Sequence, residues 1–190
     1  MAVEPPVGIL LAAGRGKRFD PSGECDKLLA LLPSGIPVAV AAAMNLCAAL
    51  PRVIAVVRPD VDILATLLRN AGCEVVVCPQ ADEGMGTVLA CAIQHSADAA
   101  AWVVALADMP FIAAETYASV VDALAANNLV APEFSGQRGH PVGFGRQHLT
   151  HLLSLQGDSG ARGLFAAGTP HLFATTDRGV IRDIDTASDL

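Results

Sequence analysis

Four basic side chains gather in one short segment of a chain that is otherwise acidic. The segment spans residues 15–27 and holds both lysines of the protein, Lys17 and Lys27, together with Arg15 and Arg18. Because the formal net charge is −7, the chain repels anions on average and needs a local positive site to hold one. Gly14, just before this segment, and Gly16, within it, allow backbone N–H groups to approach phosphate oxygens closely. The spacing predicts a polyphosphate-binding loop, and the plainer alternative is a surface loop with solvated charges.

The glycines of this loop do not match two common nucleotide-binding patterns. Phe19 stands where the dinucleotide fingerprint needs its third glycine, and no acidic residue ends a strand about 20 residues further on. The Walker pattern needs Ser or Thr after Gly-Lys, whereas Gly16 and Lys17 are followed by Arg18. The loop is therefore expected to hold phosphates in another way.

Two carboxylates are candidates for binding a divalent cation. Asp108 ends the apolar run at residues 102–107, which predicts a buried strand. Mg²⁺ commonly takes one or two carboxylates, and water and phosphate oxygens fill its other positions. The second carboxylate is Asp183 or Asp185, which alternation along a strand would place on one face, so the spacing leaves both open. The alternative role for each candidate is a turn or a helix cap.

A capping-box pattern at Thr186 and Asp189 predicts the start of a further helix near the end of the chain. We expect this final helix to be truncated.

Short apolar runs alternate with helical patterns through the first part of the chain. Strands are predicted at residues 7–11, 53–57, 74–77, 102–106 and 129–131. Helices are predicted at residues 38–50, 60–71, 87–96 and 115–126. This alternation predicts an α/β fold with a mainly parallel sheet and helices on both faces. Because such sheets bind ligands beyond the carboxyl ends of their strands, the glycine loop and Asp108 are expected at the same edge.

The remainder of the chain is punctuated by proline and glycine and is expected to complete the same domain. Strands are predicted near residues 142–144, 171–175 and 180–184, and helices near 147–155 and 161–167. We expect one domain over residues 1–190, with a nucleotide-binding half at 1–131 and an acceptor-side half at 132–190.

Composition excludes several classes of protein. The longest apolar stretch, residues 36–50, is interrupted by Pro37 and Asn45, so no membrane span is expected. The five cysteines lack CxxC spacing, which favours reduced thiols in a cytoplasmic protein. The N-terminus lacks the basic region of a secretory signal. The acidic balance and the few aromatic residues argue against a nucleic-acid partner.

Seven motifs, in chain order, resemble the molybdenum cofactor cytidylyltransferases, relatives of the guanylyltransferases of the same pathway. The motifs lie at residues 11–18, 26–29, 83–86, 108–110, 138–142, 157–162 and 183–186. The Arg-Gly-His-Pro and Gly-Asp-x-Gly-Ala-Arg motifs point to the cytidylyl branch more than to its guanylyl relatives. The first loop of those relatives more often reads Leu-Ala-Gly-Gly. The chain departs from the family at Asp20, where glycine is usual, and near Val88, where serine is more common.

The resemblance implies a three-layer Rossmann-like nucleotidyltransferase fold and a reaction. The enzyme would move CMP from CTP, or another nucleoside triphosphate, onto the phosphate of a molybdopterin-type acceptor and release pyrophosphate. Arg18 would stabilise the leaving pyrophosphate and Lys27 the α-phosphate, while Asp108, with Asp185 as helper, would carry Mg²⁺. In-line transfer of this kind needs positioning and charge neutralisation more than a covalent nucleophile.

The resemblance also assigns binding residues. Those implied for the nucleotide are Leu11, Ala12, Ala13, Gly14, Arg15, Gly16, Lys17, Gly84, Met85 and Gly86. Arg138 and His140 are implied for the acceptor, and their plainer alternatives are ion pairing and a buried histidine.

Two other functions stay open on the sequence. One is a transferase of the same fold that uses another nucleotide or acceptor, such as a guanylyltransferase. The other is a non-catalytic carrier that hands the cofactor to a molybdoenzyme or its chaperone, which the presence of both Lys27 and Asp108 disfavours. The base, the acceptor and the oligomeric state do not follow from spacing.

Overall fold

Four short apolar strands form the parallel half of an eight-stranded sheet. The computed structural model describes residues 5–16, 18–20, 25–159, 161, 163–164, 168 and 170–190. The parallel strands are β1 (Val7–Leu11), β2 (Val53–Val57), β3 (Glu74–Val77) and β4 (Ala101–Leu106), and they lie in the order β3-β2-β1-β4. β1, β2 and β4 are almost wholly buried, because both faces of the sheet are covered.

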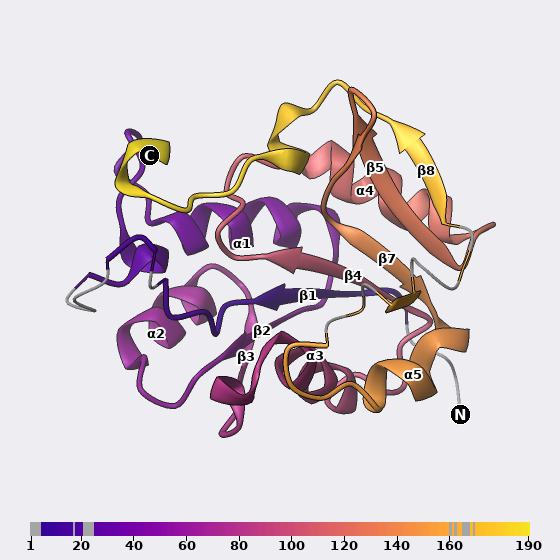
Figure 1. Ribbon diagram of the computed structural model, residues 1–190, viewed down its shortest axis with the longest axis horizontal. Coiled ribbons are helices and arrows are strands. Elements are labelled where there is room, and N and C mark those ends of the chain that lie inside the picture. Colours follow the sequence, from indigo (N-terminus) through magenta and orange to yellow (C-terminus); the bar gives the residue numbers. More distant parts are fainter. Residues whose placement is uncertain are drawn as a thin grey trace.

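The parallel strands end at the same level. Leu11 pairs with Val56 of β2 and with Leu106 of β4, so the segments that follow these strands leave from one edge of the sheet. Figure 1 shows the arrowheads of β1 and β4 pointing to the same side, where the C-terminus also lies. This edge therefore receives residues 12–16, 58–60 and 107–110.

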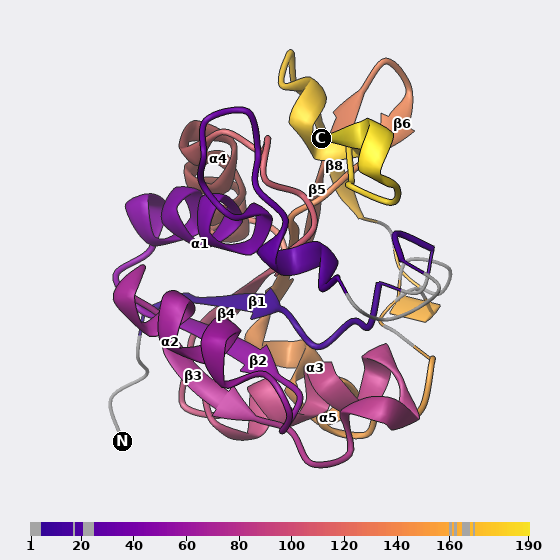
Figure 2. The ribbon, with the colours of Figure 1, turned by 90° about the vertical axis from the view of Figure 1, so that its left-hand side faces the viewer.

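The second part of the sheet is mixed. β7 (Val142–Gly145) is antiparallel to β4, and β5 (Leu129–Phe134) is antiparallel to β7. β5 also carries the short antiparallel strand β6 (Gln137–Arg138) and the parallel strand β8 (His171–Ala174). β6 and the turn that joins it to β5 lie at the top of Figure 2.

Helices cover both faces of the sheet and complete a three-layer α/β architecture. One hydrophobic core contains side chains of α1 (Val38–Ala49), α2 (Asp62–Asn70) and α4 (Ala114–Leu124). The other contains those of α3 (Met85–Gln94) and α5 (Leu149–Leu153). Figures 1 and 2 show α1 and α4 on one side of β1 and β4, and α3 and α5 on the other. The predicted fold class, a mainly parallel sheet between two helical layers, is confirmed.

The strand predicted at residues 180–184 is wrong. A 3₁₀ helix, η4 (Arg178–Ile181), takes its place, and the residues after it have no regular structure. Asp177 caps this helix by accepting from Gly179 N at 2.8 Å, and the same side chain accepts from Ala113 N and Thr116 Oγ1. The apolar Val180 and Ile184 are buried against the core rather than paired in the sheet, so an alternating pattern here reflects anchoring of a loop.

Other differences concern lengths. α5 spans five residues, preceded by the 3₁₀ helix η3 (Arg146–His148), where a longer helix was expected at 147–155. β5 extends beyond its predicted end, and β6 was not predicted. Most of the helix predicted at 161–167 lies outside the described residues. Within the part of the chain that is described, no helix is both long and apolar enough to cross a membrane.

Candidate active site

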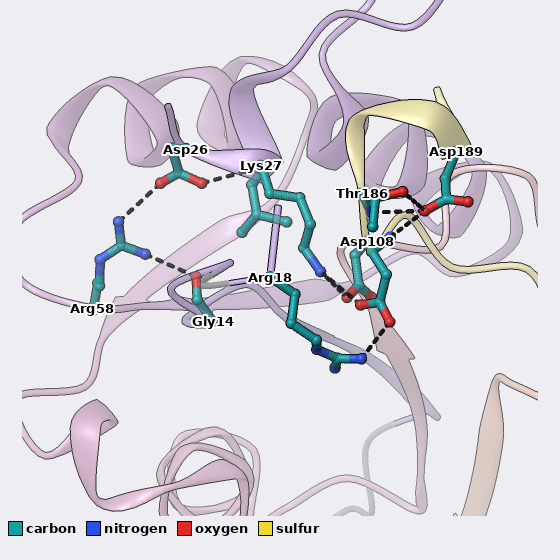
Figure 3. Close-up of polar contacts among 10 residues, drawn as sticks. Gly14, Arg18, Asp26, Lys27, Arg58, Asp108, Thr186 and Asp189 are labelled. Carbon is teal, nitrogen blue, oxygen red and sulfur yellow. Dashed lines mark hydrogen bonds and ion pairs between the residues drawn. The ribbon is translucent and has the colours of Figure 1, made fainter. Parts of the chain in front are cut away.

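Charged side chains from three distant parts of the chain converge at the carboxyl edge of the sheet (Figure 3). Lys27 begins the 3₁₀ helix η1 (Lys27–Leu29), and its Nζ lies 2.7 Å from Oδ2 of Asp108, just beyond β4. The same Nζ lies 3.9 Å from Oδ1 of Asp185, whose Oδ2 accepts from Arg18 Nη1 at 2.5 Å. The Lys27 side chain is only 10 % exposed, whereas that of Arg18 is 79 % exposed. The structure thus brings together the four residues expected for catalysis and metal binding.

The backbone around Ile184 decides which of the two C-terminal aspartates joins this cluster. Ile184 is fully buried, and its N–H donates to the carbonyl oxygen of Asp108 at 2.8 Å. The following residue, Asp185, therefore lies next to Asp108, whereas Asp183 is exposed on the other side of the anchor. Of the two alternatives that the spacing left open, the structure places Asp185 at the cluster.

A capping box near the end of the chain binds the backbone N–H of Asp185. Thr186 caps the terminal 3₁₀ helix η5 (Ala187–Asp189), as its sequence pattern predicts. Oδ2 of Asp189 accepts from Thr186 N at 2.7 Å, from Thr186 Oγ1 at 2.8 Å and from Asp185 N at 3.2 Å. These donors stabilise the charged carboxylate, so the hydrogen bonds from Thr186 lower the pKa of Asp189 below its usual value.

Thr186→Ala is expected to raise the pKa of Asp189 toward its ordinary value of 3.8, because the hydroxyl donor is lost. A carboxyl whose folded-state pKa is depressed stabilises the fold above its unfolded-state pKa, and this contribution disappears as the pH falls through the folded-state pKa. The stability difference between wild type and variant should therefore be constant near neutral pH and shrink below about pH 3.8. Denaturant unfolding across this range, with a carboxyl NMR titration, measures both effects.

Ser188→Ala is the matched control, because the Ser188 hydroxyl contacts Thr186 Oγ1 at 2.8 Å but does not bond to Asp189. It should leave the pKa of Asp189 close to its wild-type value. A Thr186→Ala stability difference that persists unchanged into strong acid would show that the hydroxyl acts in another way.

The glycine loop after β1 lies against the segment that carries Lys27. Gly16 adopts a φ of +59°, and its carbonyl accepts from Phe19 N at 2.8 Å. A Cβ on Gly16 would stand 2.9 Å from Cβ of Lys27, so only glycine allows this close approach. Lys17 lies outside the described residues.

Arg15 is exposed and pairs with two carboxylates. Its guanidinium donates to both oxygens of Asp82, at 2.6 and 2.7 Å, and lies 3.5 Å from Asp60. The bidentate bond to Asp82 raises the pKa of Arg15 above its usual range. Arg15 therefore joins the loop to the 3₁₀ helix η2 (Ala81–Glu83).

A cavity of about 420 Å³ lies between the glycine loop and the start of α3. The predicted site residues that line it are Leu11, Ala13, Gly14, Arg15, Gly16, Lys27, Gly84, Met85 and Asp108. Two predicted nucleotide contacts are placed elsewhere. Ala12 is fully buried beneath the loop, and Gly86 packs against the backbone of residues 156–159.

A second cavity of about 410 Å³ adjoins the first and shares Leu11, Met85, Leu106 and Asp158 with it. Arg138 and His140, the residues predicted to bind the acceptor, line this second cavity. The remaining wall is mostly apolar and includes Val142 and Phe144 of β7. The two predicted binding regions are therefore neighbouring parts of one cleft, with Asp108 and Lys27 on the side of the first cavity.

Comparison with known proteins assigns the chain to a family. Residues 8–172 match the model of the MobA-like NTP transferase domain. The chain belongs to the MobA-like NTP transferase family. No curated protein sequence matches this transferase.

Solved structures of similar proteins share the fold of this MobA-like transferase over nearly the whole chain. Rv0371c from Mycobacterium tuberculosis H37Rv is 27 % identical, with a TM-score of 0.80 over 98 % of this chain and 96 % of that one. Rv0371c has also been solved in complex with manganese, with 25 % identity, a TM-score of 0.74 and coverage of 97 % and 95 %.

Two more distant structures show the fold alone. The nucleotidyl transferase Mth528 from Methanothermobacter is 18 % identical, with a TM-score of 0.81 and coverage of 97 % and 93 %. Molybdopterin-guanine dinucleotide biosynthesis protein A from Archaeoglobus fulgidus is 16 % identical, with a TM-score of 0.68 and coverage of 96 % and 94 %. The match of residues 8–172 to the family model confirms the predicted nucleotidyltransferase superfamily.

The Gly-Met-Gly motif of this MobA-like transferase is shaped by packing. Gly84 has a φ of +133°, and a Cβ there would stand within 2.5 Å of Asp158 N. Gly86 N donates to Gly157 O at 2.8 Å, and Thr87 Oγ1 accepts from Gly157 N at 3.0 Å. The two glycines therefore admit the backbone of residues 157–158, which places Asp158 between the two cavities.

Gly84→Ala is expected to destabilise this MobA-like transferase by about 2 kcal/mol or more, because overpacking adds to the strain of a left-handed residue. Urea unfolding measures the loss. Gly14→Ala is the matched control for stability, since a Cβ at Gly14 would meet nothing within 4 Å. Equal unfolding free energies for the two variants would contradict the packing role of Gly84.

Three residues that hold the loops of this MobA-like transferase are not predicted from its sequence. Arg58 and Asp60 follow β2 at the carboxyl edge of the sheet, and Asp82 lies in η2. A charged residue directly after a buried strand was the available signal for Arg58, as it was for Asp108. For Asp82 no signal exists, because its partner Arg15 is 67 residues away in the chain.

Proposed function

We propose that the protein transfers CMP from CTP to the phosphate of a molybdopterin-type acceptor and releases pyrophosphate. The observation that carries the transfer chemistry is the position of Lys27, whose Nζ contacts Asp108 and lies near Asp185 beside a cavity walled by a glycine loop. Cations and carboxylates in this arrangement suit in-line transfer at a phosphate, which depends on positioning and charge neutralisation. The seven motifs support the cytidylyl branch and the pterin acceptor.

The two carboxylates fit a divalent cation. Asp108 and Asp185 come from different segments and face the same ammonium group, and two carboxylates are what Mg²⁺ commonly takes from a protein. Among the described residues, no third acidic, histidine or cysteine side chain completes a metal-binding group. The remaining positions would be filled by water and phosphate oxygens, so the ion would neutralise charge on the triphosphate. The manganese complex of Rv0371c supports a divalent cation in this family.

The side chains of the protein have distinct roles in this proposal. Amides of the glycine loop and Arg18 bind the β- and γ-phosphates and stabilise the departing pyrophosphate. Lys27 neutralises charge that develops on the α-phosphate. Deep burial strengthens this interaction, because water screens Lys27 little. The attacking oxygen is the phosphate of the acceptor, so no side chain needs to act as a nucleophile.

The second cavity is the proposed acceptor site. It adjoins the nucleotide cavity, with which it shares Leu11 and Met85, so an acceptor bound there would lie next to the triphosphate. Arg138 supplies a cation for the acceptor phosphate, and His140 a ring nitrogen. The mostly apolar lining of this cavity suits a ring system.

GTP is the second candidate nucleotide. Val88 lines the first cavity, where relatives more often carry serine, so this position offers no hydrogen bond to a base or ribose. The likeness in fold to the molybdopterin-guanine dinucleotide protein of A. fulgidus also favours testing a guanylyl reaction.

Pyrophosphate release with CTP, GTP, ATP and UTP tests the proposal. Each nucleotide is supplied with Mg²⁺, with and without molybdopterin or its molybdenum-loaded form. Release that requires both CTP and the pterin is the expected result. Release with GTP would move the protein to the guanylyl branch, and no release with any nucleotide would favour another acceptor or a carrier.

A further inference from the structure

Arg58 is a nearly buried arginine at the carboxyl edge of the sheet, and the proposed chemistry does not use it directly. It follows β2 immediately, and β2 pairs with β1 so that Val56 lies opposite Leu11. Arg58 therefore leaves the sheet beside the glycine loop. Its side chain is only 11 % exposed, and an arginine this buried needs charged or polar partners.

Two hydrogen-bond acceptors and one ion-paired carboxylate, from three segments, surround the guanidinium, and Figure 3 shows the two acceptors. Nη1 donates to the carbonyl oxygen of Gly14 at 3.0 Å, and Nη2 donates to Oδ2 of Asp26 at 2.9 Å. Nε lies 3.1 Å from Oδ1 of Asp60. Only a planar fork with several donors can satisfy partners in these directions at once, so lysine cannot replace arginine here.

The bond to Gly14 fixes one peptide of the glycine loop. In a trans peptide the carbonyl oxygen and the following N–H point in opposite directions. Because the Gly14 carbonyl is turned toward Arg58, the N–H of Arg15 is turned away from it. A carbonyl that rotated toward the phosphates would repel them, whereas an N–H in its place attracts them. Arg58 thus holds the Gly14 carbonyl oxygen on one side of the peptide and leaves the Arg15 N–H on the opposite side.

The bond to Asp26 fixes the segment that carries Lys27. Oδ1 of Asp26 accepts from Leu28 N at 2.9 Å and so caps η1, while Oδ2 is held by Arg58. Asp26 is only 15 % exposed, so this ion pair is little screened by water. Since Lys27 is the first residue of η1, movement of Asp26 would displace the Lys27 ammonium from Asp108.

We infer that Arg58 is a positioning residue that locks the glycine loop and Lys27 into one geometry for a nucleoside triphosphate. The inference rests on the proposed function, because it concerns the same nucleotide site. It adds a residue outside the proposed phosphate and metal ligands, and it couples the glycine loop to the segment that carries Lys27.

Arg58→Lys tests the inference, and Arg52→Lys is its matched control. Arg52 lies at the opposite end of the same strand, where its guanidinium bonds to Glu74 at 3.1 Å and to the carbonyl of His95 at 3.2 Å. Both replacements keep the charge and lose the fork, but only Arg58 touches the glycine loop and Asp26. Thermal unfolding of both variants reports the structural cost of each change.

Nucleotide binding is measured first by calorimetry, without acceptor, using CTP, GTP, ATP and UTP with Mg²⁺. Steady-state pyrophosphate release then gives kcat and KM. Arg58→Lys is expected to weaken triphosphate binding and to lower kcat, with a loss in kcat/KM of about a hundredfold, since displacements of about 1 Å cost this much. Arg52→Lys is expected to keep both constants within about twofold of wild type.

Rescue by a small cation separates positioning from general destabilisation. Millimolar guanidinium should restore part of the activity of Arg58→Ala, because the ion can occupy the space between Gly14 and Asp26, and it should not restore Lys27→Ala. If Arg58 variants do not fold, Asp26→Asn carries the same test, since it keeps the cap on Leu28 and removes the ionic bond to Arg58.

The outcomes separate the two proposals. If the wild type binds a triphosphate and Arg58→Lys binds it equally and turns over equally, the positioning role of Arg58 is refuted and the proposed function stands. If Arg52→Lys loses as much kcat/KM as Arg58→Lys, the effect is general and the inference fails. If the wild type binds no nucleoside triphosphate, the proposed function and the inference are both refuted.

Discussion

Lys27→Ala is expected to lower kcat by about a hundredfold or more, because removing one preorganised electrostatic donor costs roughly 3 kcal/mol of transition-state stabilisation. The Lys27 side chain is 10 % exposed and its ammonium lies 2.7 Å from Asp108, so water cannot readily take its place. Pyrophosphate release under saturating nucleotide and Mg²⁺ measures the effect. KM for the nucleotide should change less than kcat, since the charge that Lys27 neutralises grows as the α-phosphate reacts.

An exposed cation serves as the control for Lys27. Arg69 lies in the last turn of α2, away from the site, and Arg69→Ala removes the same unit of charge. Its turnover should match that of the wild type. Because Lys27→Ala leaves Asp108 without this partner, unfolding of the variant is measured alongside. Wild-type turnover in a folded Lys27→Ala protein would exclude the proposed role.

Asp185→Asn is expected to raise the Mg²⁺ concentration needed for half-maximal rate and to lower the rate at saturating Mg²⁺ by about a hundredfold. A bound metal supplies several kcal/mol of charge stabilisation, and each 1.4 kcal/mol or so corresponds to a tenfold change in rate. The replacement keeps the size of the side chain but removes the charge that lies 3.9 Å from Lys27 and 2.5 Å from Arg18. Initial rates across a Mg²⁺ titration give both constants, and Asp108→Asn should behave in the same way.

Asp183→Asn is a closely matched control, because it removes the same charge two residues earlier in the same segment. Asp183 is exposed, and the buried Ile184 separates it from the cluster. The Mg²⁺ dependence of this variant should equal that of the wild type. If Asp183→Asn shifts the Mg²⁺ dependence as strongly as Asp185→Asn does, Asp185 is not the second metal ligand.

Much of the sheet was predictable because local patterns determine it. Runs such as Val53–Val57 are apolar at every position, which is typical of a strand buried on both faces. Such runs predicted a strand at each of the four positions where the structure has a parallel one. The convergence of the glycine loop and Asp108 also followed, since parallel strands deliver their carboxyl ends to one edge. These inferences need only the order of elements along the chain.

The C-terminal segment was harder to predict because its apolar residues are not in a strand. Val180 and Ile184 lie in a short apolar run typical of a strand, but each is buried as the anchor of a segment outside the sheet. Asp177 bonds to α4 residues more than 60 positions earlier in the chain and so stabilises a 3₁₀ helix over pairing in the sheet. The local apolar pattern cannot reveal a competing interaction with residues so distant in the sequence.

The sequence by itself determined the layered α/β fold, the edge that carries the site and the residue types available there, because these depend on local periodicity and strand order. Tertiary structure alone decided which side chains meet. It placed Asp185 rather than Asp183 beside Asp108, paired Arg15 with Asp82, and put Arg58 between Gly14 and Asp26. Each of these contacts joins residues at least 30 positions apart, so its geometry depends on how whole elements pack and not on any local pattern.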